Sequence, residues 1–195
     1  RRRRLAVRVP GGHAVIVSEA SWTAPRPDCP HPERWHSTDN QSTEIEVTEL
    51  VAAWVRALQP GYVLETGTCI GQTAHAIGLA LRENGHGRLV TLETDPDRAA
   101  VARARCRGLP VTVLEVPSLE FEPDEPVGFA WFDSLIELRL PEFERFRPHL
   151  TEGAVVGFHD TGPHFGPYGA SIEAVEGLST IRLRTPRGAT FAQVR

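Results

Sequence analysis

The sequence predicts an α/β protein with a doubly wound, mostly parallel sheet of about seven strands that ends in an antiparallel hairpin. Three observations predict this fold class. Apolar strand segments alternate with segments of helical periodicity from residue 44 onward, which favours a parallel sheet with helices on both faces. A glycine-rich turn follows the first of these strands. The final strand segments, 180–184 and 189–194, flank a Thr-Pro-Arg-Gly turn that is typical of a hairpin.

Composition limits the functions that the chain can have. Its 195 residues fit one domain of ordinary size. A net charge of −4 provides no basic field for nucleic acid or an anionic membrane, although arginines occupy positions 1–4, which we expect to be a solvated tail. All 21 basic residues are arginine, which excludes a lysine base or Schiff base. The three cysteines lack Cys-x-x-Cys spacing, so we expect free thiols. Because no apolar run is long enough to span a membrane, we expect a cytoplasmic protein.

Residues 1–40 are predicted to be an N-terminal extension or lid, followed by one domain over residues 41–195. The stretch 14–17 predicts a strand, and the rest of the extension is rich in proline and irregular. Three of its residues are candidates for a lid over a substrate, although packing against the domain is the favoured interpretation: Trp22, Trp35 and His36. The domain is expected to begin with an amphipathic helix over 44–58, because Thr43 and Glu46 have capping-box spacing ahead of it.

The run 63–71 is the centre of the predicted site. It brings a strand to a carboxylate and then turns at two glycines before a helix expected over 72–81. Gly67 permits a positive φ and close approach of a ligand, while the N–H groups of the loop can hold a polar group. The Gly-x-x-x-Gly spacing differs from the Gly-x-Gly-x-x-Gly of dinucleotide-binding loops. Ligand contacts are expected from four residues of the run: Glu65, Gly67, Thr68 and Gly71.

Polar residues also follow the next strand segments. The strand over 88–92 ends at Glu93, 22 residues after Gly71, where an acid can accept hydrogen bonds from ribose hydroxyls. Asp95 and Pro96 are then expected to start the next helix as N-cap and first helical residue. The nearly all-apolar strand over 111–116 is expected to be covered on both faces.

Three further polar residues are expected to meet across a crevice. The strand over 127–132 ends at Asp133, the strand over 153–158 ends at His159 and Asp160, and parallel strands end at one edge of a sheet. A histidine with two carboxylates can hold an octahedral divalent ion. The alternative is that Asp160 caps the next turn and His159 is a hydrogen-bonded strand-end histidine. A helix is expected over 141–147, and the aromatic loop 161–169 is the candidate substrate pocket.

The ordered set Glu65-x-Gly67-x-x-x-Gly71, Glu93, Asp133 and His159-Asp160 resembles class I S-adenosylmethionine (SAM) methyltransferases over about residues 44–195. It looks most like metal-dependent, small-molecule O-methyltransferases of the catechol and antibiotic-tailoring types. The resemblance implies a Rossmann-like fold and SAM as cofactor, with Glu65 near its methionine end and Ser118 and Leu119 beside the adenine. It also implies a divalent metal such as Mg²⁺ on Asp133, His159 and Asp160.

Methyl transfer to a hydroxyl of a small molecule is the activity that this resemblance implies. The catechol-type enzymes place a lysine base three residues after the aspartate, where this chain has Ile136. A proton is then expected to leave through the metal, through His159 or His164, or through the acidity of the substrate itself. Asp133, His159 and His164 are therefore the catalytic candidates. A non-catalytic SAM-binding protein and an NAD(P)-dependent oxidoreductase are the alternatives, and the oligomeric state, a homodimer included, is open.

Overall fold

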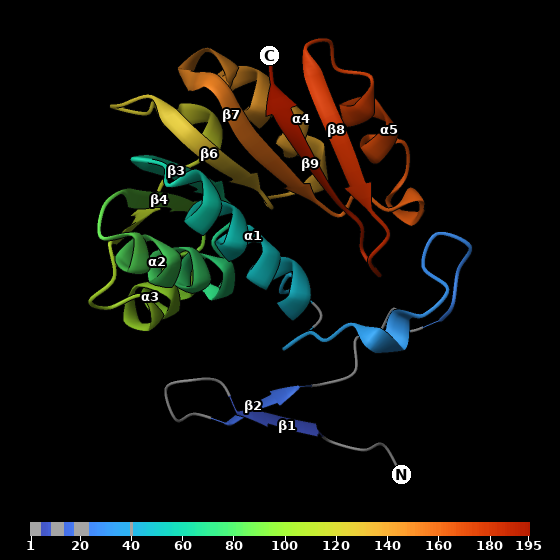
Figure 1. Cartoon of the computed structure of the whole chain (residues 1–195). Coiled ribbons are helices and arrows are strands. Elements are labelled where there is room, and N and C mark those ends of the chain that lie inside the picture. Colours follow the sequence, from blue (N-terminus) through green and yellow to red (C-terminus); the bar gives the residue numbers. More distant parts are fainter. Residues whose placement is uncertain (1–4, 9–13, 18–23, 40) are drawn as a thin grey trace.

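The computed structural model describes residues 5–8, 14–17, 24–39 and 41–195. The tail expected at residues 1–4 and the lid candidate Trp22 lie outside these ranges. A seven-stranded sheet with the order β5-β4-β3-β6-β7-β9-β8 forms the centre of the protein (Figure 1). Its strands are β3 (Tyr62–Thr66), β4 (Arg88–Glu93), β5 (Val111–Glu115), β6 (Val127–Phe132), β7 (Leu150–His159), β8 (Leu178–Leu183) and β9 (Ala189–Val194).

Strand pairing confirms the predicted fold class. The neighbours from β5 to β7 all pair in parallel, while β9 pairs antiparallel with both β7 and β8. The helices are α1 (Ile45–Leu58), α2 (Gln72–Asn84), α3 (Pro96–Arg105), α4 (Ile136–Phe146) and α5 (Tyr168–Glu173), with short 3-10 turns η1 (Pro32–Arg34), η2 (Ser118–Glu120), η3 (Arg147–His149) and η4 (Pro163–Phe165). A separate antiparallel pair joins β1 (Leu5–Arg8) to β2 (Ala14–Val17).

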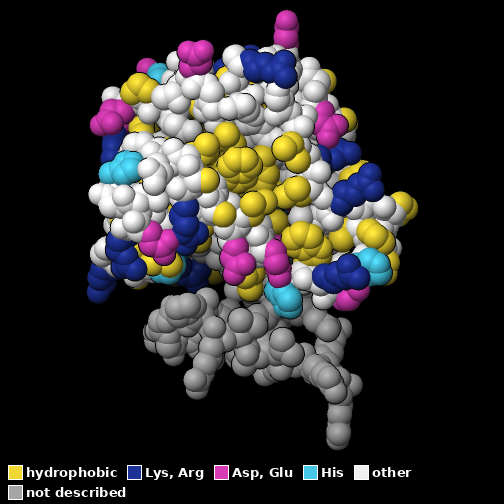
Figure 2. All heavy atoms as spheres, in the orientation of Figure 1, with side chains coloured by type: hydrophobic (Ala, Val, Ile, Leu, Met, Phe, Trp, Pro, Cys, Tyr) yellow, Lys and Arg dark blue, Asp and Glu magenta, His cyan; other side chains and the backbone are white. Residues whose placement is uncertain are grey.

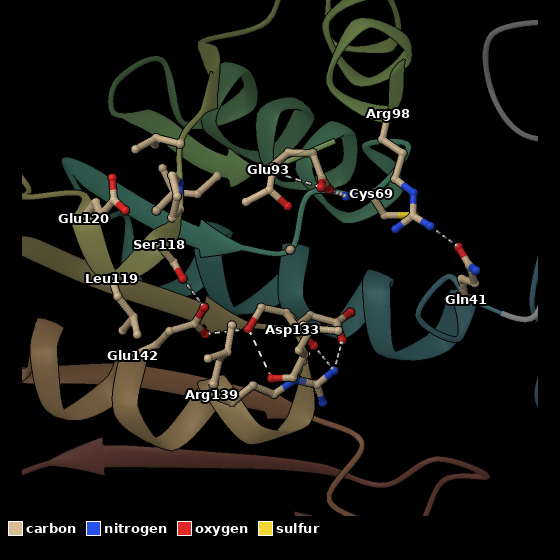
Figure 3. Close-up of a pocket in the computed structure, with 18 of the residues that line it drawn as sticks. Gln41, Cys69, Glu93, Arg98, Ser118, Leu119, Glu120, Asp133, Arg139 and Glu142 are labelled. Carbon is tan, nitrogen blue, oxygen red and sulfur yellow. Dashed lines mark hydrogen bonds and ion pairs between the residues drawn. The ribbon is translucent and has the colours of Figure 1, made fainter. Parts of the chain in front are cut away.

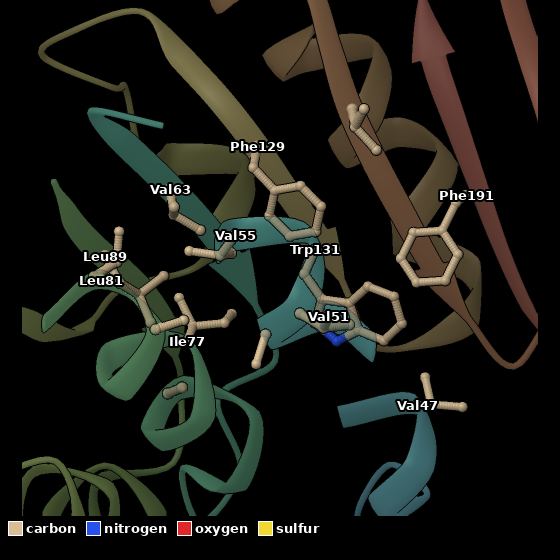
Figure 4. Close-up of a cluster of buried hydrophobic side chains, with 14 of the residues drawn as sticks. Val47, Val51, Val55, Val63, Ile77, Leu81, Leu89, Phe129, Trp131 and Phe191 are labelled. Atoms are coloured by element: carbon tan, nitrogen blue, oxygen red, sulfur yellow. The ribbon is translucent and has the colours of Figure 1, made fainter. Parts of the chain in front are cut away.

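Two hydrophobic clusters hold helices to opposite faces of the sheet. Successive side chains of a strand point to opposite faces, so Trp131 and Phe132 belong to different clusters. On the first face, Trp131 belongs to one cluster with Val51 of α1 and Ile77 of α2 (Figure 4). On the second face, Phe132 packs among the aromatic rings of α4 and β7, at 5.1 Å between ring centroids from Phe158. The sheet is therefore a rigid base for whatever its strand ends carry.

The capping box predicted at the start of α1 is wrong. Glu44 is the N-cap residue, and its side chain makes no capping hydrogen bond. The Thr43 hydroxyl instead donates to Oδ2 of Asp133 at 2.7 Å, and Glu46 accepts a hydrogen bond from the backbone N–H of His36. Both side chains bond to residues outside α1, and these two hydrogen bonds take the place of the predicted capping bonds.

Two other local predictions also fail for tertiary reasons. Pro141 lies inside α4 rather than at its start, since the helix begins at Ile136. The strand expected to be covered on both faces is β5, which lies at the edge of the sheet and is only partly buried. The Asp95 cap is confirmed, because its carboxylate accepts from the backbone N–H groups of Asp97 and Arg98.

Hydrophobic side chains gather on the face that α1 shares with the antiparallel end of the sheet (Figure 2). Trp54 of α1 packs on Phe191 of β9, at 5.9 Å between ring centroids. Ile181 lies directly opposite Phe191 in the β8–β9 register and is 62% exposed. Within the described part of the chain, no helix is long and apolar enough to cross a membrane.

Candidate functional site

A cavity of about 660 Å³ opens at the carboxyl ends of β3, β4 and β6 (Figure 3). This volume is in the range of small-molecule and cofactor sites. Residues that the sequence predicted as ligand contacts supply part of its wall, namely Gly67, Glu93, Ser118, Leu119 and Asp133. Residues that the sequence did not single out supply the rest, namely Gln41, Cys69, Leu92, Thr94, Arg98, Val116, Pro117, Glu120, Ser134, Leu135, Leu138, Arg139, Glu142 and Arg187.

Gly67 is required where β3 meets β6. Its φ is +80°, and a Cβ added there would lie 2.2 Å from the backbone oxygen of Asp133. Its N–H donates to the oxygen of Leu92 at the end of β4. The predicted positive φ is confirmed. The close approach that it permits is to the backbone of Asp133, so the glycine brings three strand ends together beside the cavity.

Glu93 holds the glycine loop against the next helix while facing the cavity. Its Oε2 accepts the N–H of Cys69 at 2.7 Å, and its Oε1 accepts the N–H groups of Thr94 and Asp95 at 2.9 and 3.0 Å. A carboxylate has about four acceptor positions. Three are used by the backbone, which leaves capacity at Oε2 for one hydroxyl of a bound ligand.

Glu65, Thr68 and Gly71 do not line the cavity. Glu65 is buried and accepts a hydrogen bond from the hydroxyl of Thr91, which in turn bonds to the hydroxyl of Thr68. A Cβ on Gly71 would meet Ala102 of α3 at 2.9 Å, so this glycine lets α2 and α3 approach each other. In this structure the three residues support the loop from behind.

Burial raises the pKa of Glu65 to about 8, although the bond from Thr91 opposes this shift. An acid with a raised pKa takes up a proton on folding, so wild-type stability should fall as pH rises from about 4.5 to about 8. Glu65→Gln copies the neutral form and should remove this fall. Above pH 8 we expect the variant to be more stable than wild type by roughly 2 to 4 kcal/mol.

Urea unfolding of both proteins between pH 5 and 9 measures this effect. Glu49→Gln, at an exposed position of α1, is the control and should follow the wild-type curve. Parallel curves for wild type and Glu65→Gln would show that Glu65 is ionised in the folded protein at neutral pH.

Glu142 joins three segments of the cavity wall. This fully buried carboxylate on α4 accepts hydrogen bonds from the hydroxyls of Thr66, Ser118 and Ser134, which follow or end three different strands. Ser118 is thereby held in place on the side that the sequence assigned to adenine. A carboxylate with three hydroxyl donors is well satisfied, and it rigidifies this wall.

Asp133, His159 and Asp160 come together as predicted. One ligand atom from each lies within 4.8 Å of the others, a grouping that could hold a metal ion. His159 is fully buried, and its Nδ1 bonds to Asp133 Oδ1 at 2.9 Å. Its Nε2 bonds to Glu44 Oε2 at 2.6 Å. No local sequence pattern indicates this role of Glu44, which is 115 positions from His159.

Two arginines complete this group, which we call the strand-end cluster: Glu44, Asp133, Arg139, His159, Asp160 and Arg187. Nη2 of Arg139 lies 3.1 Å from Asp133 Oδ1 and 2.9 Å from Asp160 Oδ2. Arg187 pairs with both oxygens of Asp160 through Nε and Nη2. Figure 3 shows Arg139 and Asp133 bonded at one side of the cavity.

The carboxylates of the cluster keep His159 protonated. Burial alone would lower its pKa, but Asp133, Asp160 and Glu44 outweigh burial and raise the pKa of His159 to about 10. Burial would raise the pKa of Asp160, but His159, Arg139 and Arg187 hold it well below its usual range. His159 therefore donates through both nitrogens and has none with which to accept a proton.

The residues present do not fit a divalent ion in this arrangement. Such an ion needs deprotonated ligands with available lone pairs. Both nitrogens of His159 donate to carboxylates, while Arg139 and Arg187 occupy the oxygens of Asp160. The Arg139 guanidinium lies between the carboxylates of Asp133 and Asp160, so an ion could bind there only after that guanidinium was displaced.

The loop 161–169 lies outside the main cavity. His164 is exposed and packs on Phe165, at 4.2 Å between ring centroids. Gly162 and Pro163 line a smaller cavity of about 220 Å³ beside the β8–β9 connection. Of the lid candidates, Trp35 packs against the core cluster beneath α1 and His36 bonds to Glu46, so both support the packing interpretation.

Comparison with known proteins identifies the family. A family model for a methyltransferase domain matches residues 64–161, whereas no curated protein matches the chain. Among solved structures, an O-methyltransferase from Bacillus cereus in complex with S-adenosylhomocysteine (SAH) is 21% identical, with a TM-score of 0.66 over 80% of this chain and 83% of that chain.

Two more structures share the fold. The O-methyltransferase TomG from Streptomyces achromogenes, which is involved in tomaymycin synthesis and was solved with SAM, is 20% identical, with a TM-score of 0.66 over 80% of this chain and 82% of that chain. The SAH-bound methyltransferase PaMTH1 of Podospora anserina is 15% identical, with a TM-score of 0.67 over 80% and 81%. The sheet order, the cavity at its strand ends and the family match lead to one conclusion: the chain belongs to the methyltransferase domain family.

Proposed function

We propose that this methyltransferase transfers the methyl group of SAM to a hydroxyl group of a small molecule. The observation that carries the proposal is the cavity itself, which joins the glycine loop at Gly67 to the carboxylate of Glu93 and to Asp133. Solved proteins of the same fold bind SAM or SAH, and two of them are O-methyltransferases. Glu93 would accept from a ribose hydroxyl, and the wall with Ser118 and Leu119 would contact the adenine.

The proposed reaction depends on positioning. A bound SAM would present its methyl group to an acceptor oxygen held in line with it, and such orientation can supply much of the rate enhancement. His159 cannot act as base because both of its nitrogens donate, and His164 lies outside the cavity. Asp133 faces the cavity but already accepts from Thr43, Arg139 and His159. We therefore propose an acceptor hydroxyl that is acidic enough to lose its proton to solvent, such as a phenol. The phenolate oxygen would then take the methyl group as its bond to the SAM sulfur breaks, and SAH would leave.

Metal assistance, which the sequence predicted, does not enter this proposal. The predicted ligands are adjacent, but their donor atoms are engaged by arginine and glutamate side chains. A homodimer and a cytoplasmic location stay predictions. The acceptor is proposed only as a class, because acceptor pockets in this fold are formed by loops.

Glu93→Ala is expected to weaken SAH binding about 5- to 150-fold, which corresponds to the loss of roughly 1 to 3 kcal/mol of hydrogen bonding. The variant loses both the ribose acceptor and the brace on the N–H of Cys69. Isothermal titration calorimetry measures the affinity, and a thermal melt shows whether the variant is folded. Glu49→Ala removes an exposed carboxylate of α1 outside the cavity and should bind SAH like wild type. Equal SAH affinity in wild type and a folded Glu93→Ala would place the ribose elsewhere.

A further inference from the structure

Arg139 of α4 supplies a positive charge close to the position where related enzymes have a lysine. The resemblance leads one to expect a lysine at Ile136, but Ile136 packs into the hydrophobic cluster on the second face of the sheet. Arg139 follows three residues later on α4, and residues at this spacing lie on the same side of a helix. Its side chain is only 3% exposed and reaches both carboxylates of the predicted metal site. The chain therefore supplies a fixed cation from α4, the helix that begins at the position of the family's lysine.

The guanidinium of Arg139 occupies the place that a metal would take. A single nitrogen, Nη2, lies 3.1 Å from Asp133 Oδ1 and 2.9 Å from Asp160 Oδ2. An ion shared by these carboxylates would have to lie about 2.0 to 2.6 Å from each, in the same space between them. Further bonds anchor the guanidinium, because Nε donates to the oxygen of Ser134 at 2.9 Å and Nη1 donates to the oxygen of His159. A planar fork with this many acceptors is held rigidly.

Two arginines, whose side chains stay protonated in proteins, already pair with the carboxylates that an ion would need. Arg139 pairs with Asp133 and Asp160, and Arg187 pairs with Asp160. Most of these side chains are buried, so each charge needs its partner. A divalent ion would add two charges and displace Arg139 from a buried position. The cluster therefore excludes an ion by both geometry and charge.

We propose that Arg139 replaces the divalent metal, so that the strand-end cluster of this enzyme binds no metal ion and the site functions without one. The claim that the site functions without a metal rests on the proposed methyl transfer. Whether the cluster binds a metal ion can be measured independently of that reaction. In this arrangement Arg139 is a positioning residue. It fixes Asp133 at the cavity wall and Asp160 beneath it, the task that a shared ion would otherwise perform.

Mn²⁺ binding tests the proposal directly. Protein is stripped with EDTA, desalted and titrated with Mn²⁺ alone, and free Mn²⁺ is followed by electron paramagnetic resonance. Wild type should leave nearly all of the added Mn²⁺ free, even at millimolar Mn²⁺ concentrations. Arg139→Met removes the guanidinium and should bind one Mn²⁺ at least tenfold more tightly than wild type. Adding Asp133→Asn to that variant should abolish the gain, while Arg139→Lys, which keeps a cation, should resemble wild type.

Two results would overturn the proposal. One is a wild-type protein that binds one Mn²⁺ and loses it on Asp133→Asn. The other is a folded Arg139→Met that gains no Mn²⁺ affinity, because the arginine would then not be what keeps the ion out. If Arg139→Met does not fold, the wild-type and Asp133→Asn titrations still decide the question. A failure to bind SAH would contradict the proposed function and leave these metal titrations valid.

Discussion

Replacing His159 with alanine is expected to lower the free energy of unfolding by about 3 to 5 kcal/mol, the cost of removing one partner from a buried ion pair. The protonated ring joins Asp133 to Glu44, so its loss removes a charged partner from two carboxylates and opens a cavity beside Trp131. For a protein of this length, the melting temperature should fall by roughly 6 to 20 °C. Thermal unfolding followed by circular dichroism measures the change.

His164→Ala is the matched control for this prediction. His164 is exposed and outside the cavity, so its replacement should shift the melting temperature by no more than about 2 °C. Similar melting temperatures for His159→Ala and wild type would mean that the strand-end cluster contributes little to the fold. Methyl transfer that survives His164→Ala would also remove this histidine as a base.

Gly67→Ala is the second change with a large expected effect. The residue has a φ of +80°, and its new Cβ would lie 2.2 Å from the oxygen of Asp133. We expect a cost of about 1 to 2 kcal/mol for the left-handed backbone and a further ~1 to 3 kcal/mol for the forced separation of β3 and β6. SAH affinity should fall more than tenfold, because the loop and Asp133 form the same wall of the cavity.

Gly85→Ala separates the two parts of this cost. Gly85 has a φ of +76° at the end of α2, and a Cβ there would meet nothing within 4 Å. This variant should therefore show only the left-handed backbone cost and normal SAH binding. Urea unfolding and calorimetry on both variants give the comparison. If Gly67→Ala and Gly85→Ala lose the same stability and bind SAH equally, the close approach at Gly67 has no role.

Features whose signal is local in the sequence were predictable. The turn at Gly67, the acid at the end of β4 and the aspartate at the end of β6 each follow an apolar strand, and parallel strands bring such ends to one edge. The N-cap of α3 was equally clear, because Asp95 and Pro96 have a strong local preference for a helix start. The sheet and its hairpin followed from the order of these elements.

Features that depend on distant partners were not predictable. Arg187 and Asp160 are 27 positions apart, and Glu44 and His159 are 115 apart, so no local pattern joins them. Thr43 is an example in which a local pattern misled the prediction. Its spacing to Glu46 is that of a capping box, but its hydroxyl bonds to the distant Asp133 instead of capping the helix. Arg139 carried no motif, and its role emerged only from the side chains packed around it. The charges and hydrogen bonds of the strand-end cluster are therefore determined by pairs of residues that are distant in the sequence and meet only in the folded protein.

Methyl transfer from labelled SAM in the presence of EDTA tests the account most directly. The purified chain would be incubated with labelled SAM and a panel of phenols and aliphatic alcohols, with NAD⁺ and NADP⁺ tested for hydride transfer in parallel. We expect a labelled methyl ether from at least one phenol, full activity in EDTA and no stimulation by added Mg²⁺. SAM binding without transfer to any acceptor would favour a non-catalytic SAM-binding protein. Activity that appears only with Mg²⁺, or hydride transfer in place of methyl transfer, would contradict metal-free methyl transfer.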